Sequence, residues 1–241
     1  MLKTIHDEKN LFEIGVDECA RGPMFGRLYT AAVVLPKQDF DFSNMKDSKK
    51  IKSRKKMREI SDYIKSNAIA WSIQYIEPEE IDKINIRQSV LKSMRASIVD
   101  VVQQLQLCKS DVESQTLTIV DGNDFPTYRF DFNGEIVELP HICVEKADNT
   151  YCFVAAASIL AKCAHDEYIV DLCEKYPLLQ ERYALCDNVG YGTKKHMEGI
   201  QTYGITQWHR TTYGCCKTAT KYIMENPVSE TSVESSPSSH S

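Results

Sequence analysis

The chain has 241 residues, 42% of them hydrophobic and 26% charged, which is long enough and apolar enough for a globular protein with its own core. No stretch reaches the apolar length of a membrane span, and the charged N-terminus lacks the apolar segment of a signal peptide. The net charge of −5 counts against a nucleic-acid-binding protein, although lysines and arginines cluster at 46–58 and 194–195 and part of the acidity lies near the C-terminus.

The first part of the chain predicts strands joined by turns. Residues 13–17 and 28–35 are alternating or β-branched apolar segments, and the Gly- and Pro-containing CARGPMFG between them predicts a turn. Residues 68–76 predict a third strand, so the sheet is expected to begin with antiparallel pairing. Apolar residues at helical spacing predict a helix over about 53–66.

The middle of the chain alternates between helix and strand patterns. An apolar stripe with helical spacing runs over 86–107 and predicts a helix. Residues 116–121, TLTIVD, predict a short buried strand that ends at an aspartate, and another strand is expected within 136–144. This alternation is typical of an α/β domain.

The last third predicts helices followed by a tail. Residues 153–173 predict a long helix, and from about 175 a C-terminal region is expected to consist of a loop and a helix near 194–203. Residues 225–241 are rich in Ser, Glu and Pro and predict a disordered acidic tail. We therefore predict one α/β catalytic domain over 1–224, with a mixed sheet flanked by helices and a helical C-terminal extension.

The nine cysteines are scattered, with no CxxC pair and no Cys/His group at zinc spacing. This pattern favours reduced thiols that pack as small hydrophobic side chains. We expect the protein in a reducing compartment, the cytoplasm, with the nucleus as an alternative.

Acidic side chains stand at or just after the ends of predicted strands. Asp17 and Glu18 close the first strand, Asp121 closes the strand in TIVDGN, and Asp148 follows another strand. Clustered carboxylates repel one another and are costly to bury without a cation. Their hard oxygen atoms suit Mg²⁺ or Mn²⁺, and two such ions about 3.5–4 Å apart can support phosphodiester cleavage.

The same residues have an ordinary structural explanation. Asp and Asn are common at turns, and a helix cap or Asx-turn would account for Asp121 and its neighbours Gly122 and Asn123. Spacing and residue type alone therefore leave two alternatives open: a carboxylate metal site, or a set of turn residues.

Several segments resemble motifs of the ribonuclease HII family, the type 2 ribonucleases H. In order along residues 13–213 they are IGVDECARGPMFG, KDSKK, TIVDGN, VEKADNTYCFVAAASILAKCAHDE, GYGTKKH and HRTTY. The resemblance implies the ribonuclease H-like fold. It also implies that Asp17, Glu18, Asp121 and Asp148 are the catalytic residues and hold two divalent metal ions, Mg²⁺ or Mn²⁺. We expect Asp166 to support or cap the site, with a role as a metal ligand as the lesser alternative. Water would then attack the phosphorus and leave 5′-phosphate and 3′-hydroxyl ends.

The resemblance also implies how substrate is recognised. Ala20, Arg21 and Gly22 match the family's glycine-rich loop, which reads the ribonucleotide through backbone groups, including its 2′-hydroxyl. The first glycine of that loop is Ala20 here, which would be strained if the position requires a positive φ. Tyr191 matches the tyrosine that packs on the sugar at the RNA–DNA junction. Arg27 stands where a proline is usual.

Three further residues are expected to contact substrate. Lys49 of DSKK is a candidate phosphate contact, and Ser158 and Lys162, one helical turn apart, can share a face toward the backbone phosphate. A structural role for Ser158 and Lys162 is an equal alternative. The histidines show no ligand pairing, and His209 with Arg210 is expected to be structural or to face phosphate.

The predicted partner is an RNA–DNA hybrid or duplex DNA that contains ribonucleotides. One alternative is an enzyme of the same fold that needs a run of ribonucleotides, and another is a catalytically inactive hybrid-binding subunit. A non-specific DNA nuclease would not need the ribose-reading loop. No membrane association is expected, no protein partner is evident because the tail has no sliding-clamp motif, and we expect a monomer.

Overall fold

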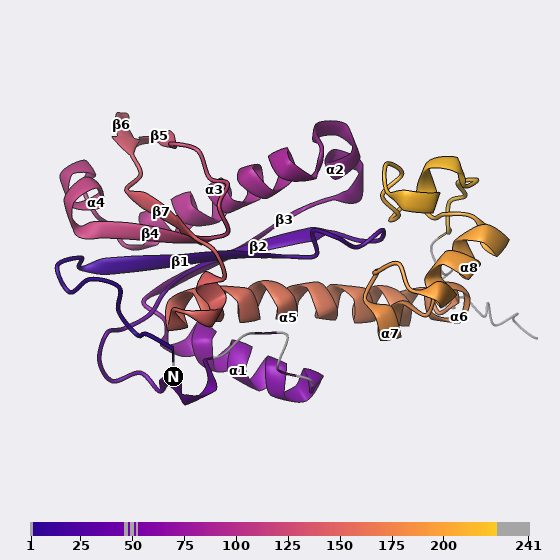
Figure 1. Ribbon diagram of the computed structural model, residues 1–241, viewed down its shortest axis with the longest axis horizontal. Helices are drawn as coiled ribbons and strands as arrows, with labels where there is room; N and C mark the ends of the chain where they lie inside the picture. The colour runs from indigo at the N-terminus through magenta and orange to yellow at the C-terminus, as the bar shows by residue number, and fades with distance from the viewer. Residues whose placement is uncertain (1, 46–47, 49–50, 52, 226–241) are drawn as a thin grey trace, which may run out of the picture.

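A computed structural model of the chain describes residues 2–45, 48, 51 and 53–225. Its framework is a five-stranded mixed sheet with the strand order β3-β2-β1-β4-β7 (Figure 1). The strands are β1 (Phe12–Cys19), β2 (Leu28–Val34), β3 (Ala70–Ile76), β4 (Thr116–Asp121) and β7 (His141–Val144). β2 is antiparallel to both β1 and β3, whereas β1, β4 and β7 are parallel, so their carboxyl ends lie at the same edge.

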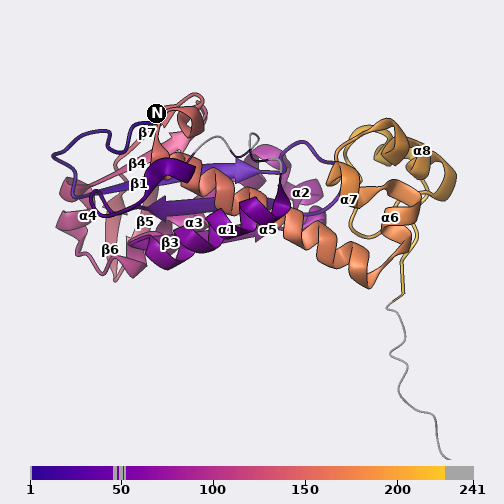
Figure 2. The ribbon, with the colours of Figure 1, turned by 90° about the horizontal axis from the view of Figure 1, so that it is seen from below.

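Helices cover both faces of this sheet. The long helix α5 (Cys152–Lys175) and α1 (Arg54–Asn67) lie on one face, and α3 (Ile86–Gln104) lies on the other (Figures 1 and 2). Two shorter helices, α2 (Pro78–Ile84) and α4 (Lys109–Gln115), flank α3 in the sequence. Of the helices within the described residues, none is long and apolar enough to pass through a membrane.

Alternating side chains of the strands build one hydrophobic core on each face. Ala31 and Val33 of β2 point into the core with α1 and α5, and Ala32 and Val34 point into the core with α3. All four side chains are almost fully buried. Because each strand sends successive side chains to opposite faces, the face of any residue near a strand end follows from its neighbours.

A third cluster forms beyond the end of the sheet. We call residues 176–224 the C-terminal module; it contains α6 (Leu178–Tyr183), α7 (Leu185–Asn188), α8 (Lys194–Tyr203) and the 3₁₀ turn η4 (Gly214–Thr218). α5 extends past the strands to reach it (Figure 1). The core of the module includes Phe25, which lies in the turn between β1 and β2. The module is therefore packed directly against that turn.

The structure confirms the mixed sheet flanked by helices and corrects two details. The single strand expected within 136–144 is two: β6 (Glu135–Glu138) pairs with β5 (Arg129–Phe132) in a separate hairpin, and β7 joins the main sheet. Asn133 and Gly134 both have positive φ, as a tight hairpin turn requires. The loop expected after Tyr176 is also wrong, since α6 and α7 form there as helices too short to show a periodic pattern.

Candidate active site

The close contact between β1 and α5 depends on Gly15, which has no side chain. A Cβ at Gly15 would overlap the backbone carbonyl of Phe153, so α5 crosses β1 at a distance that only glycine permits. Asp17 lies two residues further on the same face of the strand. This places its carboxylate beside Ser158 of α5, whose hydroxyl donates a hydrogen bond to it.

The carboxyl ends of the parallel strands bring the other acids close. Val16 of β1 is in register with Val120 of β4, so Asp17 and Asp121 stand next to each other at the ends of neighbouring strands. Asp148 lies in the 3₁₀ turn η3 (Ala147–Asn149), which follows β7, the next strand along. The arrangement follows the rule that open α/β sheets expose functional side chains at the carboxyl ends of their strands.

The four acids line one cavity of about 650 Å³, together with every other described residue that we expected to contact substrate. The lining consists of Asp17, Glu18, Cys19, Ala20, Arg21, Gly22, Ser48, Asp121, Lys146, Asp148, Asn149, Ser158, Lys162 and Tyr191. Lys49 lies outside the described residues.

Hydrogen bonds fix the orientation of three of the acids. An oxygen of Asp17 accepts the backbone N–H of Glu18 at 2.7 Å, and an oxygen of Asp121 accepts the N–H of Ala147 at 2.6 Å. The second bond ties the end of β4 to the turn that carries Asp148. The side-chain amide of Asn149 donates to Asp148 at 3.0 Å. These bonds hold separate chain segments around one space.

The electrostatics of this cluster favour a bound cation. Burial, with the negative charges of Glu18 and Asp121, raises the pKa of Asp17 well above its ordinary value, although the Ser158 hydroxyl opposes the shift. A divalent ion would offset this repulsion, and four carboxylates are the hard oxygen donors that Mg²⁺ and Mn²⁺ prefer. Among the described residues, no three acidic, histidine or cysteine side chains are already placed to hold one ion. The carboxylate oxygen atoms of these four residues fit such ions by their chemistry.

The loop of Ala20, Arg21 and Gly22, called the 20–22 loop below, lies beside the acids. Ala20 has a φ of +68°, so this alanine adopts the left-handed conformation that favours glycine. The strain considered from the sequence is therefore present. The Arg21 guanidinium is 3.8 Å from the Glu18 carboxylate, which places the loop directly next to the acidic cluster.

Tyr191 faces this loop from the C-terminal module. Its side chain is 45% exposed, and a Cβ built on Gly22 would be 3.5 Å from the Tyr191 ring. The N–H of Met24 donates to the carbonyl of Gly190 at 2.9 Å, which fixes the Tyr191 segment to the β1–β2 turn. The ring is thus an accessible apolar surface at the edge of the cavity.

Ser158 and Lys162 line the α5 side of the cavity. The Ser158 hydroxyl is 3.0 Å from the Ser48 hydroxyl, and the Lys162 ammonium is 2.5 Å from both oxygens of Asp166. Burial alone would raise the pKa of Asp166, but hydrogen bonding from His165 and the charge of Lys162 outweigh it and lower that pKa. Asp166 is held as a partner of Lys162 and is not among the residues that line the cavity.

Some features of the site were not expected from the sequence. Lys146 lines the cavity with a φ of +57°, and no periodic pattern marks such a residue. Arg27 lies between two aromatic rings, 4.0 Å from the Tyr75 centroid and 4.4 Å from the Tyr168 centroid, and its guanidinium also bonds Glu77. The aromatic partners come from β3 and α5, so only the folded chain explains this arginine.

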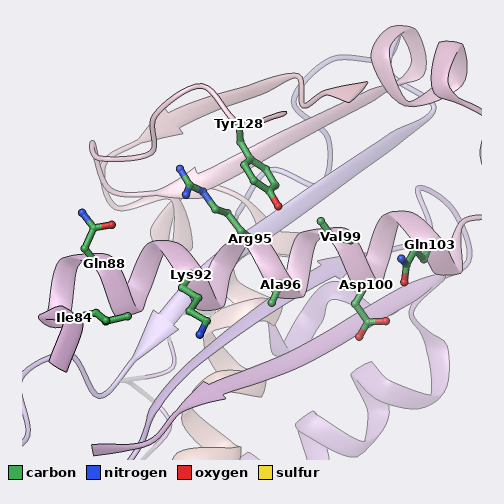
Figure 3. A pocket seen from close by; sticks show the side chains of 9 residues that line it. All are labelled: Ile84, Gln88, Lys92, Arg95, Ala96, Val99, Asp100, Gln103 and Tyr128. Carbon is green, nitrogen blue, oxygen red and sulfur yellow. The ribbon is translucent and has the colours of Figure 1, made fainter. Parts of the chain in front are cut away.

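A larger hollow elsewhere lacks this chemistry. It has a volume of about 830 Å³ and lies along the outer side of α3, where Tyr128 closes one side and Arg95 stacks 4.9 Å from its ring centroid (Figure 3). Its lining contains one carboxylate, Asp100, which accepts a hydrogen bond from Ser72. Among the hollows of the described residues, the acidic cavity is therefore the candidate active site.

Known proteins are similar to this chain in sequence and in fold. The family model of Ribonuclease HII matches residues 14–216. Ribonuclease HII of Parabacteroides distasonis is 39% identical over 206 residues, which cover 86% of this chain and 92% of that protein. Ribonuclease HII of Bacteroides thetaiotaomicron is 42% identical over 208 residues, which cover 85% and 90% of the two chains.

Two solved structures have a similar fold. Ribonuclease H2 from Pyrococcus horikoshii OT3 superposes with a TM-score of 0.63 at 22% identity, over 86% of this chain and 95% of that one. Bst-RNase HIII in complex with Mn²⁺ gives a TM-score of 0.56 at 16% identity, over 81% and 71% of the two chains. At these identities the structures establish the ribonuclease H-like fold.

Proposed function

Because the chain belongs to the ribonuclease HII family and is a type 2 ribonuclease H, we propose that it hydrolyses the RNA strand of RNA–DNA hybrids. We propose that it also cuts duplex DNA at single embedded ribonucleotides. The observation that carries the proposal is one shared cavity. In it, the carboxylates of Asp17 and Asp121 face the same space as the 20–22 loop and Tyr191. Groups for cleavage and groups for reading a ribose are thus within reach of one nucleotide.

Asp17, Glu18, Asp121 and Asp148 are proposed as catalytic residues that hold two divalent ions, Mg²⁺ or Mn²⁺. The support is the buried, mutually repelling set of carboxylates and the similarity to a ribonuclease HIII structure described as a complex with Mn²⁺. Bound ions would lower the pKa of a water molecule and stabilise the developing charge on the leaving oxygen. The products would carry 5′-phosphate and 3′-hydroxyl ends.

The remaining cavity residues are proposed to bind and orient the substrate. Backbone groups of the 20–22 loop lie where a 2′-hydroxyl can be read, which is the group that separates RNA from DNA. The half-exposed Tyr191 ring offers an apolar surface for the sugar. Lys162 and Ser158 line the same cavity, and their ammonium and hydroxyl groups are proposed to contact a backbone phosphate.

This activity fits a role in removing ribonucleotides from DNA during replication and repair. We propose that the protein acts as a monomer in the cytoplasm, on nucleic acid alone. Its nine cysteines are all free thiols, as a reducing compartment would keep them.

The test is cleavage of two substrates in Mg²⁺ and in Mn²⁺: duplex DNA with one ribonucleotide, and a continuous RNA–DNA hybrid. The wild-type protein should cut both, and Asp17→Asn should lose at least about a thousandfold in rate, or about 4 kcal/mol of barrier lowering. Binding of an uncleaved hybrid by the Asp17→Asn variant should persist. If the wild-type protein binds but cleaves neither substrate, it is a hybrid-binding subunit and the proposal fails.

A second candidate is an enzyme that needs a run of ribonucleotides. The observation in its favour is the alanine at position 20, which holds a strained left-handed conformation where glycine would be relaxed. Cleavage of the continuous hybrid without cleavage at a single ribonucleotide would establish this candidate. The conformation itself argues for the first proposal, because Ala20 keeps the φ that suits glycine.

A further inference from the structure

Two consecutive residues of the C-terminal module, His209 and Arg210, are 1% and 0% exposed. Their segment runs beside the β1–β2 turn: the N–H of Arg210 donates to the carbonyl of Met24 at 2.8 Å, and the N–H of Gly26 donates to the carbonyl of Trp208 at 2.9 Å. Neither side chain lines the cavity. The Arg210 side chain is bonded instead to backbone carbonyls of the β1–β2 turn, and the His209 ring to Thr206 and His196.

The Arg210 side chain is bonded to the 20–22 loop from behind. Its guanidinium donates to the carbonyls of Ala20 at 2.8 Å, Arg21 at 3.2 Å and Gly26 at 3.0 Å. Only arginine presents several N–H donors in a rigid planar fork that can hold three carbonyls at once. Two of these carbonyls belong to the 20–22 loop, so the guanidinium fixes the two peptide planes that directly follow the strained Ala20 conformation.

His209 reaches Tyr191 through a second histidine. The backbone N–H of Thr206 donates to Nδ1 of His209 at 2.9 Å, so this nitrogen carries no proton. The proton of His209 is therefore on Nε2 and donates to Nε2 of His196, 3.2 Å away. His196 then holds its proton on Nδ1, which donates to the carbonyl of Tyr191 at 3.0 Å. The bonding partners thus determine both tautomers, and the chain ends on the backbone of Tyr191.

We propose that His209 and Arg210 are positioning residues that together set the orientation of the 20–22 loop relative to Tyr191, and thereby the ratio of the cleavage rates of this enzyme on a single embedded ribonucleotide and on a continuous hybrid. The inference rests on the function proposed above. A continuous hybrid offers several ribonucleotides and tolerates a loosened loop, whereas a single ribonucleotide must be read in one position. A displacement of about 1 Å at such a site can reduce a rate about a hundredfold.

Arg210→Lys is the first test, because lysine keeps the charge but cannot bond three carbonyls at once. We expect kcat on the single-ribonucleotide duplex to fall tenfold or more, and kcat on the continuous hybrid to fall less than threefold. Adding Ala20→Gly should restore part of the ratio, since glycine adopts the positive φ without help. An equal fall on both substrates in a folded Arg210→Lys variant would overturn the proposal.

His209 provides a matched pair that tests the other branch. In His209→Gln, the amide nitrogen can take the place of Nε2 and donate to Nε2 of His196, whereas His209→Leu has no donor. The ratio of the two kcat values should survive in the first variant and fall at least fivefold in the second. Equal ratios in the two variants would contradict the proposal, even if Arg210→Lys does not fold.

Backbone amide hydrogen exchange separates this inference from the proposed function. Exchange over residues 20–26 should accelerate in Arg210→Lys, and exchange near Tyr191 should accelerate in His209→Leu but not in His209→Gln. If the wild-type protein cuts neither substrate, the proposed function fails while these exchange rates still decide whether the two residues position the loops. Unchanged exchange in both segments would overturn the positioning role.

Discussion

In the acidic half of the cavity, Asp17 is buried beside Glu18 and Asp121, and their repulsion raises its pKa. In the other half, which consists of the 20–22 loop and Tyr191 and is proposed to face the sugar, the buried groups behind the surface are His209 and Arg210, and both are bonded to the backbone. The first half is electrostatically unfavourable on its own, whereas the second is held in place by hydrogen bonds within the chain. Under the proposed function, we expect the substrate to be read by this preformed surface and the cleavage groups to be completed by bound ions.

The largest effect is expected where the acidic half depends on a backbone contact. Gly15→Ala would place a Cβ against the backbone of Phe153 and force β1 away from α5, with a loss of at least about 3 kcal/mol in unfolding free energy. Urea unfolding monitors this, and cleavage should be lost as well. Gly22→Ala is the control: its Cβ would make an ordinary 3.5 Å contact with the Tyr191 ring, so its unfolding free energy should change by less than about 0.5 kcal/mol. If Gly15→Ala unfolds at the same urea concentration as the wild-type protein, the close approach of β1 to α5 is not needed for stability.

Lowering the pH should reduce the free energy of unfolding through the buried histidines behind the 20–22 loop and Tyr191. Burial lowers the pKa of His196, and burial together with the charge of His196 lowers that of His209 well below 6.5. Both are therefore neutral in the fold, next to the Tyr183 ring. Below pH 6.5 the histidines bind protons in the unfolded chain but remain neutral in the folded protein. The free energy of unfolding therefore decreases as the pH falls from 6.5 toward the pKa values of the folded state.

For His209, whose pKa is lowered well below its ordinary value, the loss should approach about 1.4 kcal/mol for each pH unit below 6.5, and His196 should add a smaller loss. Urea unfolding at pH 7.0, 6.0 and 5.5 measures it. His165 is also buried with a lowered pKa and adds to this pH dependence. His196→Leu keeps His165 but lacks the His196–His209 pair, so the difference between the two proteins isolates the contribution of the pair. An identical pH dependence in the two proteins would contradict the tautomers assigned to the histidine chain.

Asp17→Asn should sharpen the contrast by removing charge from the acidic half. Without metal, the variant should be more stable than the wild-type protein by about 1–2 kcal/mol, because the repulsion with Glu18 and Asp121 is relieved. Thermal unfolding with and without Mg²⁺ measures this. Mg²⁺ should raise the wild-type midpoint and affect the variant much less. A variant that is less stable without metal would mean that Asp17 is held by its hydrogen bonds more strongly than it is repelled.

The acidic half was far easier to predict from the sequence than the half that faces the sugar. Asp17 and Asp121 end apolar segments that are recognisable as strands, and the parallel pairing then brings them together. His196 and His209 belong to segments without a strand or helix signal that links them, and they meet only because the C-terminal module folds around Tyr183. For Arg210 the sequence leaves two alternatives open, a structural role or a phosphate contact, and only the fold shows that its side chain is fully buried.

Similar limits explain the errors in the fold. The segment 136–144 reads as one strand because local pattern does not reveal that β6 pairs with β5 while β7 pairs with β4. The helices α6 and α7 are stabilised by burial of Leu179 and Leu185 within the C-terminal module, which no local window of sequence can show.

The smallest effect tests whether strain at the 20–22 loop matters for reading the sugar. Ala20→Gly should raise the unfolding free energy by about 1 kcal/mol, since glycine has no penalty at a φ of +68°. For a chain of this size that corresponds to about 2–4 °C in Tm. Ala184→Gly is the matched control, because Ala184 has a φ of +54° and is equally buried, but lies outside the cavity. Both variants should gain similar stability, and only Ala20→Gly should alter the ratio of single-ribonucleotide to hybrid cleavage. If the ratio of single-ribonucleotide to hybrid cleavage is equal in the two variants, the strain at position 20 does not affect how the sugar is read, and the bonds from Arg210 are sufficient to hold the loop.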